Sequence, residues 1–220
     1  MVRSIRHRMW YARTILKILG VHVTSEGPIP TEAVFFMANH RSHLDPVLSF
    51  HAPMYVVAKA EVEKWPVIGL GCKLCGAIYV KRDQKSSRKQ TLITMLDNWK
   101  KGRSILIYPE GTTNEGITTK ELKRGGFRMA AENGIPIVPI AIEYEYTSDY
   151  WVRDMLFLPH TMNMFGKKRT NVKVHYGEAI KSDNAEFLEE KTKTWIDEEL
   201  GKMQNGFLVD DAGYHKEIEG

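Results

Sequence analysis

Two residues that can move a proton stand five positions apart in the segment Met37–Pro46, which reads M-A-N-H-R-S-H-L-D-P. Within one continuous helix His40 and Asp45 would lie on different faces, but in a turn between a strand and a helix their side chains can meet. A carboxylate bonded to one imidazole nitrogen fixes the tautomer and leaves the other nitrogen to act as a base. The spacing therefore predicts general-base chemistry at a turn.

Two other interpretations of this segment stay open at this point. In the first, Asp45 only caps a helix whose first residue is Pro46, and His40 is a solvated turn residue. In the second, His40, His43 and Asp45 bind a metal ion, although no fourth group of candidate ligands stands out. The sequence contains no G-x-S-x-G nucleophile elbow, so the hydroxyl that His40 would activate is expected to be the substrate's own.

Segments of strand and helix periodicity alternate around this turn. The expected strands are 33–38, 54–58, 77–80, 104–108, 137–144 and 171–176, and the expected helices are 3–19, 46–50, 63–74, 87–100, 127–133 and 187–200. This alternation predicts an α/β single domain with a mostly parallel or mixed central sheet flanked by helices. Chemistry in such folds gathers where strands end. Pro136 and Pro139 indicate a strand entrance or an edge within the apolar segment 135–142.

Composition excludes several classes of protein. The chain has 220 residues, 43% hydrophobic and 26% charged, which is ordinary for a globular domain and not for a disordered, collagenous or coiled-coil chain. Its two cysteines, Cys72 and Cys75, argue against a disulfide scaffold and for a reducing compartment, and we expect this lone C-x-x-C to hold no metal. No apolar run approaches the roughly 20 residues of a membrane span, and no signal peptide is expected.

The predicted N-terminal helix, residues 3–19, is amphipathic. Its basic residues precede the first acid, Glu26, and most lie on one half of the helix: Arg3, Arg6, Arg13 and Lys17, with Arg8 the exception. Trp10 and Tyr11 suit a lipid headgroup zone. This pattern is typical of a helix that lies in a membrane interface. A helix that covers the sheet with its charges in solvent remains the alternative.

Four motifs in order resemble those of the glycerolipid acyltransferases, the PlsC-like family of 1-acylglycerol-3-phosphate acyltransferases. Asn39–Asp45 resembles the family's first motif, Gly76–Arg82 its Gly-x₅-Arg, Tyr108–Thr112 its F-P-E-G-T, and Ile135–Ile140 its V-P-I-V-P-V. Lys59 and the stretch 123–126 also match the family's pattern. The resemblance covers roughly residues 30–145.

The resemblance implies transfer of an acyl group from acyl-CoA or acyl carrier protein to the hydroxyl of 1-acylglycerol-3-phosphate, which gives phosphatidate. In that reaction His40 is the base and Asp45 orients it. Attack on the thioester is direct, so no covalent acyl-enzyme is expected. No cofactor is expected besides the acyl donor, which is a co-substrate.

The resemblance also implies an acceptor site. Arg82 would bind the phosphate, although a charged loop is the alternative for it. Glu110, Gly111 and Thr112 would line the site, with Lys123 nearby. Glu110 would repel a phosphate unless it paired with Arg82 or bonded the glycerol hydroxyls; otherwise it caps a turn.

One position departs from the family's pattern. The family usually continues E-G-T-R-S, whereas this chain has Thr113 in place of the arginine. Either Lys123 or Arg124 supplies the missing charge, or the acceptor is another lysolipid, such as a lyso-aminolipid.

We therefore expect a membrane-associating helix at residues 1–20, an acyltransferase domain at 21–205 and a tail at 206–220. The expected partners are membrane lipids and the acyl donor, with no nucleic acid, and the sequence leaves the oligomeric state open. The expected location is peripheral, on the cytoplasmic face of a membrane. The alternative from another functional class is a non-catalytic module that binds anionic membranes.

Overall fold

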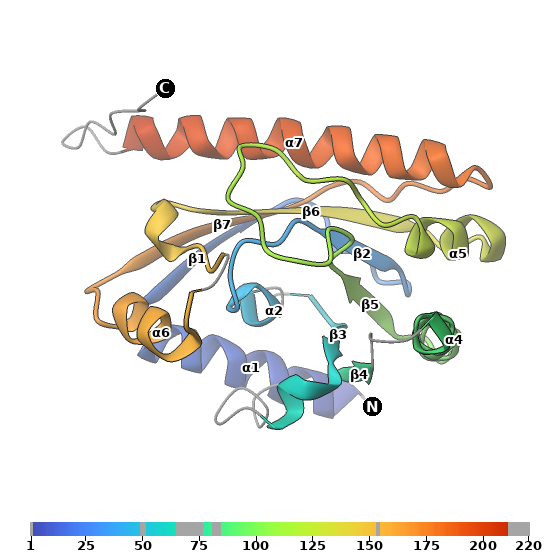
Figure 1. The fold of residues 1–220 in the computed structure, drawn as a ribbon, viewed down its shortest axis with the longest axis horizontal. Coiled ribbons are helices and arrows are strands. Elements are labelled where there is room, and N and C mark those ends of the chain that lie inside the picture. The colour runs from blue at the N-terminus through green and yellow to red at the C-terminus, as the bar shows by residue number, and fades with distance from the viewer. Residues whose placement is uncertain (1, 49–51, 65–76, 81–84, 153–154, 211–220) are drawn as a thin grey trace.

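A mixed seven-stranded sheet runs through the part of the chain that the computed structural model describes, which is residues 2–48, 52–64, 77–80, 85–152 and 155–210 (Figure 1). Its strands are β1 (Val21–Glu26), β2 (Phe35–Ala38), β3 (Met54–Lys59), β4 (Ile78–Val80), β5 (Ser104–Ile107), β6 (Ile137–Tyr144) and β7 (Thr170–Tyr176). Their order across the sheet is β1-β7-β6-β2-β5-β3-β4. All neighbours pair in parallel except β6 and β7, which are antiparallel. The predicted α/β fold with a mixed sheet is confirmed.

Helices cover both faces of the sheet. They are α1 (Val2–Ile18), α2 (Asp45–Leu48), η2 (Ala60–Lys64), α4 (Lys85–Lys100), α5 (Gly125–Asn133), η3 (Thr147–Asp149), α6 (Phe157–Phe165) and α7 (Ala185–Asp210). Figure 1 shows α7 on one side of the sheet and α1, α2 and α6 on the other. The buried side chains form one core on the side of α1, α2 and α6, a second that includes residues of α4, α5 and α7, and a smaller third between α7 and β6.

The central strands are apolar on both faces because both faces are covered. Every residue of β2 and of β6 is buried. Pro136 precedes β6, as expected of a strand entrance, but Pro139 lies within this central strand and not at a sheet edge. The ladder between β6 and β7 starts only at Ile140, and the Pro139 carbonyl accepts a hydrogen bond from the Gly177 amide at 2.9 Å. Pro139 therefore lies just outside the ladder between β6 and β7.

Other expected elements differ at their ends. Within the expected helix 63–74, the described residues belong to the short η2, and residues 65–76 lie outside the described part of the chain. The last helix, α7, continues to Asp210, past residue 206, where the tail was expected to start.

Three elements, β1, η3 and α6, were not predicted. β1 is an edge strand in which only Val21 is buried, so it carries little apolar signal. It is followed by Gly27, whose φ is +95° and on which a Cβ would lie 1.9 Å from the Tyr176 carbonyl oxygen.

The N-terminal helix packs on the sheet with its apolar half. Ala12 and Leu16 are buried in the core beneath the sheet, whereas Trp10 and Ile18 are exposed. The helix therefore covers the sheet and also presents large apolar side chains outward. None of the helices among the described residues has the length and apolar character needed to cross a bilayer.

Candidate active site

The turn between β2 and α2 brings His40 and Asp45 together. Nδ1 of His40 lies 2.7 Å from Oδ2 of Asp45. The strand ends at Ala38, at the carboxyl end of the parallel β2, and Asp45 is the first residue of α2. The contact that the sequence spacing predicted is therefore present.

Asp45 is held by four donors. Its carboxylate is fully buried, and Oδ2 also accepts from the backbone amides of Arg41 at 2.6 Å and Ser42 at 2.9 Å. Oδ1 accepts from the Tyr144 hydroxyl at 2.7 Å. Burial, and then the charge of Asp45, raise the pKa of Tyr144 well above its usual value, so the phenol keeps its proton and donates. The carboxylate thus points back into the turn and fixes it.

His40 is positioned on a second side by an aromatic ring. Its imidazole stacks on Tyr108, with ring centroids 4.2 Å apart and planes 23° from parallel. One fifth of its side chain is exposed, which leaves it accessible from solvent. With Nδ1 bonded to Asp45, Nε2 is the ring nitrogen left for base chemistry.

Glu110 binds backbone amides through both carboxylate oxygens. Oε1 accepts from the His40 amide and Oε2 from the Lys120 amide, each at 3.0 Å. The His40 carbonyl in turn accepts from the Asn114 amide at 2.8 Å. The buried carboxylate of Glu110 therefore fixes the backbone at His40, the predicted base. The expected partner Arg82 lies outside the described residues.

Gly111 and Lys123 lie against each other in the predicted acceptor site. Gly111 has φ +74°, and a Cβ on it would stand 1.9 Å from Nζ of Lys123. The Lys123 amide donates to the Pro109 carbonyl at 2.9 Å. The side chain of Lys123 therefore extends across the turn that contains Gly111 and the exposed Thr112. This arrangement places the cation of Lys123 beside Gly111, two residues before Thr113, whose carbonyl accepts from Nζ of Lys120 at 3.2 Å.

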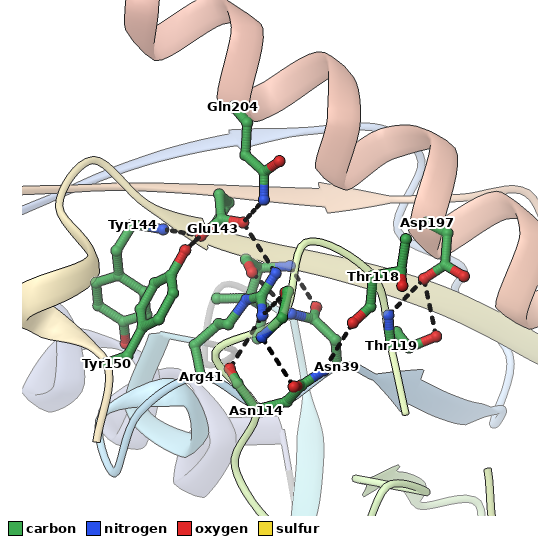
Figure 2. Close-up of polar contacts among 12 residues, drawn as sticks. Asn39, Arg41, Asn114, Thr118, Thr119, Glu143, Tyr144, Tyr150, Asp197 and Gln204 are labelled. Carbon is green, nitrogen blue, oxygen red and sulfur yellow. Dashed lines mark hydrogen bonds and ion pairs between the residues drawn. The ribbon is translucent and has the colours of Figure 1, made fainter. Parts of the chain in front are cut away.

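A buried arginine that sequence reasoning did not single out organises the loops around this turn (Figure 2). Arg41 is 1% exposed and donates to the carbonyls of Asn114 at 2.9 Å and Gly116 at 2.6 Å. It also donates to Oε2 of Glu143 at 3.1 Å. Its guanidinium lies 5.0 Å from the centre of the Tyr150 ring. The loop that follows the F-P-E-G-T-like motif is thus bound to the turn.

Glu143 receives four donors of its own. Besides Arg41 it accepts from the Tyr144 amide at 3.0 Å, from the Tyr150 hydroxyl, and from Nε2 of Gln204 on α7 at 2.8 Å. Burial, and then the charge of Glu143, raise the pKa of Tyr150, which keeps that hydroxyl a donor. This buried carboxylate joins the turn to the helix on the other side of the sheet.

Asn39 joins the same turn to β6. Its side chain donates to the Ile142 carbonyl at 2.9 Å and accepts from the Ile142 amide at 2.7 Å. One signal for these contacts was present in the sequence, because Glu143 is a charged residue inside an apolar strand. A charge in such a place is almost always paired.

His43 points away from the pair. Its Nε2 lies 3.3 Å from Oγ1 of Thr161, and its ring meets those of Trp151 and His160 edge-on, with centroids 5.7 and 5.4 Å away. Burial, followed by the nearby His160, lowers the pKa of His43 to about 4. Among the described residues, no three His, Cys, Asp or Glu side chains are arranged to hold a metal ion.

Comparison with known proteins supports the resemblance. A family model described as Acyltransferase matches residues 20–143, more than half of the chain. A crystal structure of the 1-acyl-sn-glycerophosphate acyltransferase PlsC from Thermotoga maritima superposes with a TM-score of 0.60 at 18% identity, covering 96% of this chain and 81% of that one. At this identity the superposition shows a shared fold.

The names of two curated relatives specify different acceptor lipids. The chain is 32% identical over 148 residues to a lyso-ornithine lipid O-acyltransferase of Pseudomonas aeruginosa, covering 65% of this chain. It is 30% identical over 157 residues to a 1-acyl-sn-glycerol-3-phosphate acyltransferase of Borreliella burgdorferi, covering 70% of this chain. The chain spans 56% and 60% of the lengths of these two relatives.

We expect Arg41→Ala to lower the free energy of unfolding by about 3–5 kcal/mol, because the substitution leaves the buried Glu143 without its ion pair. Urea denaturation measures this loss. Arg124→Ala is the matched control, since Arg124 pairs with Glu189 at 3.0 Å but is 60% exposed, and it should cost less than about 1 kcal/mol. Equal losses in the two variants would contradict the role of Arg41.

We expect His43 to make the fold sensitive to acid. Its pKa is about 4 in the folded protein and near 6.5 in the unfolded chain, so between these values protons bind the unfolded state preferentially. Its contribution to stability is complete above pH 6.5 and is lost as the pH falls toward 4. The loss between about pH 7 and 5 should be about 2 kcal/mol.

Urea denaturation at several pH values, on the wild type and on His43→Gln, measures this contribution. His160, Asp45 and His40 also act on His43, and they remain in the variant. The variant should therefore lose less stability than the wild type over the same interval. Parallel curves for the two proteins would refute the assignment to His43.

Proposed function

The chain belongs to the Acyltransferase family, and we propose that it transfers a fatty acyl group from acyl-CoA or acyl carrier protein to the free hydroxyl of a lysolipid. The observation that carries this proposal is the 2.7 Å contact between His40 and a buried Asp45 that four donors hold in place. A base so positioned suits the activation of an alcohol.

In the proposed reaction, Nε2 of His40 takes the proton of the lysolipid hydroxyl while the hydroxyl oxygen attacks the thioester carbonyl. Asp45 stabilises the imidazolium that forms. The tetrahedral intermediate then collapses with cleavage of the carbon–sulfur bond, and the thiolate takes the proton from His40. The products are the lipid ester and the free thiol, with no acyl-enzyme between them.

The first candidate acceptor is 1-acylglycerol-3-phosphate, which would give phosphatidate. The cation of Lys123 across Gly111 suits its phosphate, and Arg82 and Thr112 are proposed to complete that site with Glu110 as its backbone support. A lyso-aminolipid is the second candidate. Thr113 in place of the family's arginine and the lyso-ornithine lipid acyltransferase of P. aeruginosa both favour it.

We place the protein at the cytoplasmic face of a membrane, since the acceptor resides in the bilayer. The exposed Trp10 and Ile18 of α1 support this location. A purely lipid-binding module would need no base and no carboxylate to orient it, so the intact pair of His40 and Asp45 favours the enzyme.

We expect His40→Ala to reduce acyl transfer about 10²–10⁴-fold, the usual contribution of a general base. The assay follows thiol release from acyl-CoA with and without lysophosphatidate. His22→Ala is the control, because His22 is an exposed histidine on β1, and it should retain wild-type turnover. A folded His40→Ala protein, checked by circular dichroism, that turned over like the wild type would falsify the mechanism.

We expect Thr113→Arg to shift acceptor preference toward lysophosphatidate by about tenfold in kcat/KM, because a guanidinium adds two parallel bonds to a phosphate. Competition between lysophosphatidate and lyso-ornithine lipid in one reaction, with products separated by mass, measures the preference. The wild-type ratio identifies the better acceptor. If the ratio does not change in the variant, residue 113 does not contact the headgroup.

A further inference from the structure

Helix α6 and the two residues before it present apolar side chains to solvent. Leu156 and Met162 are 74% and 67% exposed. Met155, Pro159 and Asn163 are also exposed, and these five residues are called the α6 face below. Isolated exposed apolar residues are common in soluble proteins, whereas a group within one short segment marks a surface that binds something apolar.

The α6 face is bordered by positive charge. The sequence has no Asp or Glu between residues 155 and 177. Lys167, Lys168 and Arg169 follow α6 directly, and of these Lys168 and Arg169 are exposed. Lys167 is engaged by Asp149 at 2.6 Å. An apolar face beside exposed cations is complementary to a bilayer that contains anionic lipids.

The segment that follows α6 lies against Gly20, the residue that follows α1 and Leu19. A Cβ on Gly20 would lie 3.2 Å from the Lys168 carbonyl oxygen, and the Thr170 amide donates to the Gly20 carbonyl at 3.0 Å. Figure 1 shows α1 and α6 on the same side of the sheet. Ile18 is exposed near this junction, as is Lys17. The segments that follow two amphipathic helices thus meet at one corner of the molecule.

The same helix lies directly on the turn that carries the proposed base. Thr161 of α6 contacts Nε2 of His43, and the buried His160 packs against the His43 ring. The Trp151 amide donates to the Arg41 carbonyl at 2.9 Å, which fixes the segment before α6 to the turn. A surface that docks through α6 would therefore lie close to His40.

We propose that the α6 face, with Lys168, Arg169 and the exposed end of α1, docks on an anionic lipid bilayer and holds the turn of His40 beside it. The role of this docking in delivering the acceptor rests on the proposed function. A second copy of the chain is disfavoured as the occupant, because two-fold pairing of this surface would bring its cations together.

Co-sedimentation with vesicles of phosphatidylcholine containing phosphatidylglycerol tests the docking. The Leu156→Glu/Met162→Glu variant should bind about tenfold more weakly than the wild type, because it places charges in the docking face. Phe187→Glu is the matched control, since Phe187 is an exposed apolar residue on α7, on the other side of the sheet, and its binding should be unchanged. Equal binding of all three proteins overturns the proposal.

Two further measurements complete the test. Circular dichroism checks folding, and Leu156→Ser/Met162→Ser replaces the charged variant if that one does not fold; it should also bind more weakly. Sedimentation velocity reports assembly: a wild-type dimer that the double variant breaks, with vesicle binding unchanged, would assign the face to a second copy and overturn the proposal.

Acyl-transfer assays with two kinds of acceptor distinguish the docking proposal from the proposed function. With a short-chain lysolipid that stays dissolved as monomers, the double variant should turn over like the wild type, whereas with acceptor embedded in vesicles it should lose about as much activity as binding. An equal loss with both acceptors would overturn the docking role. A wild type that lacks transfer activity but binds vesicles through this face would refute the proposed function and leave the docking intact.

Discussion

The carboxylate of Asp45 must be satisfied inside the protein, and much of the local structure meets that requirement. A buried carboxylate is costly unless donors surround it. Three of its donors, the His40 ring and the amides of Arg41 and Ser42, come from the turn itself, and the fourth, the Tyr144 hydroxyl, comes from β6. The turn therefore has one favoured conformation, and in that conformation the imidazole is fixed by its bond to the aspartate and its stacking on Tyr108.

A second buried charge system supports the first from the other face of the sheet. Arg41 and Glu143 join the turn, the loop through Asn114 and Gly116, and Gln204 on α7. Glu110 adds the contact between that loop and the His40 amide. The base thus depends on segments far apart in the sequence, and the family's acidic motif contributes through the backbone of the histidine.

The sequence was informative where the chemistry is local and uninformative where the contacts are distant. His40 and Asp45 are five residues apart, so their types and the intervening turn allowed their contact, and the resemblance of Asn39–Asp45 to the family's first motif favoured it over a simple helix cap. Arg41 and Glu143 are 102 residues apart, and no periodicity indicates which charges meet across such a distance. The apolar runs of β2 and β6 predicted strands, although the prolines of β6 also indicated an edge, whereas the exposed pattern of the edge strand β1 resembles a loop. Glu110 was expected to meet Arg82 or substrate, and motif identity alone could not reveal its two amide partners.

Neighbouring side chains in β6 serve the two charge systems on opposite faces of the sheet. Glu143 is bonded by α7 on one side, and Tyr144 reaches Asp45 beside α2 on the other. Because side chains alternate along a strand, a slip of β6 by one position would turn the acid and the phenol to the opposite faces of the sheet. It would leave Asp45 without its phenol donor and Arg41 without its counter-ion. The groups that hold the histidine therefore also favour the native register of β6. A chain with a shifted register is less stable, and its site is disrupted.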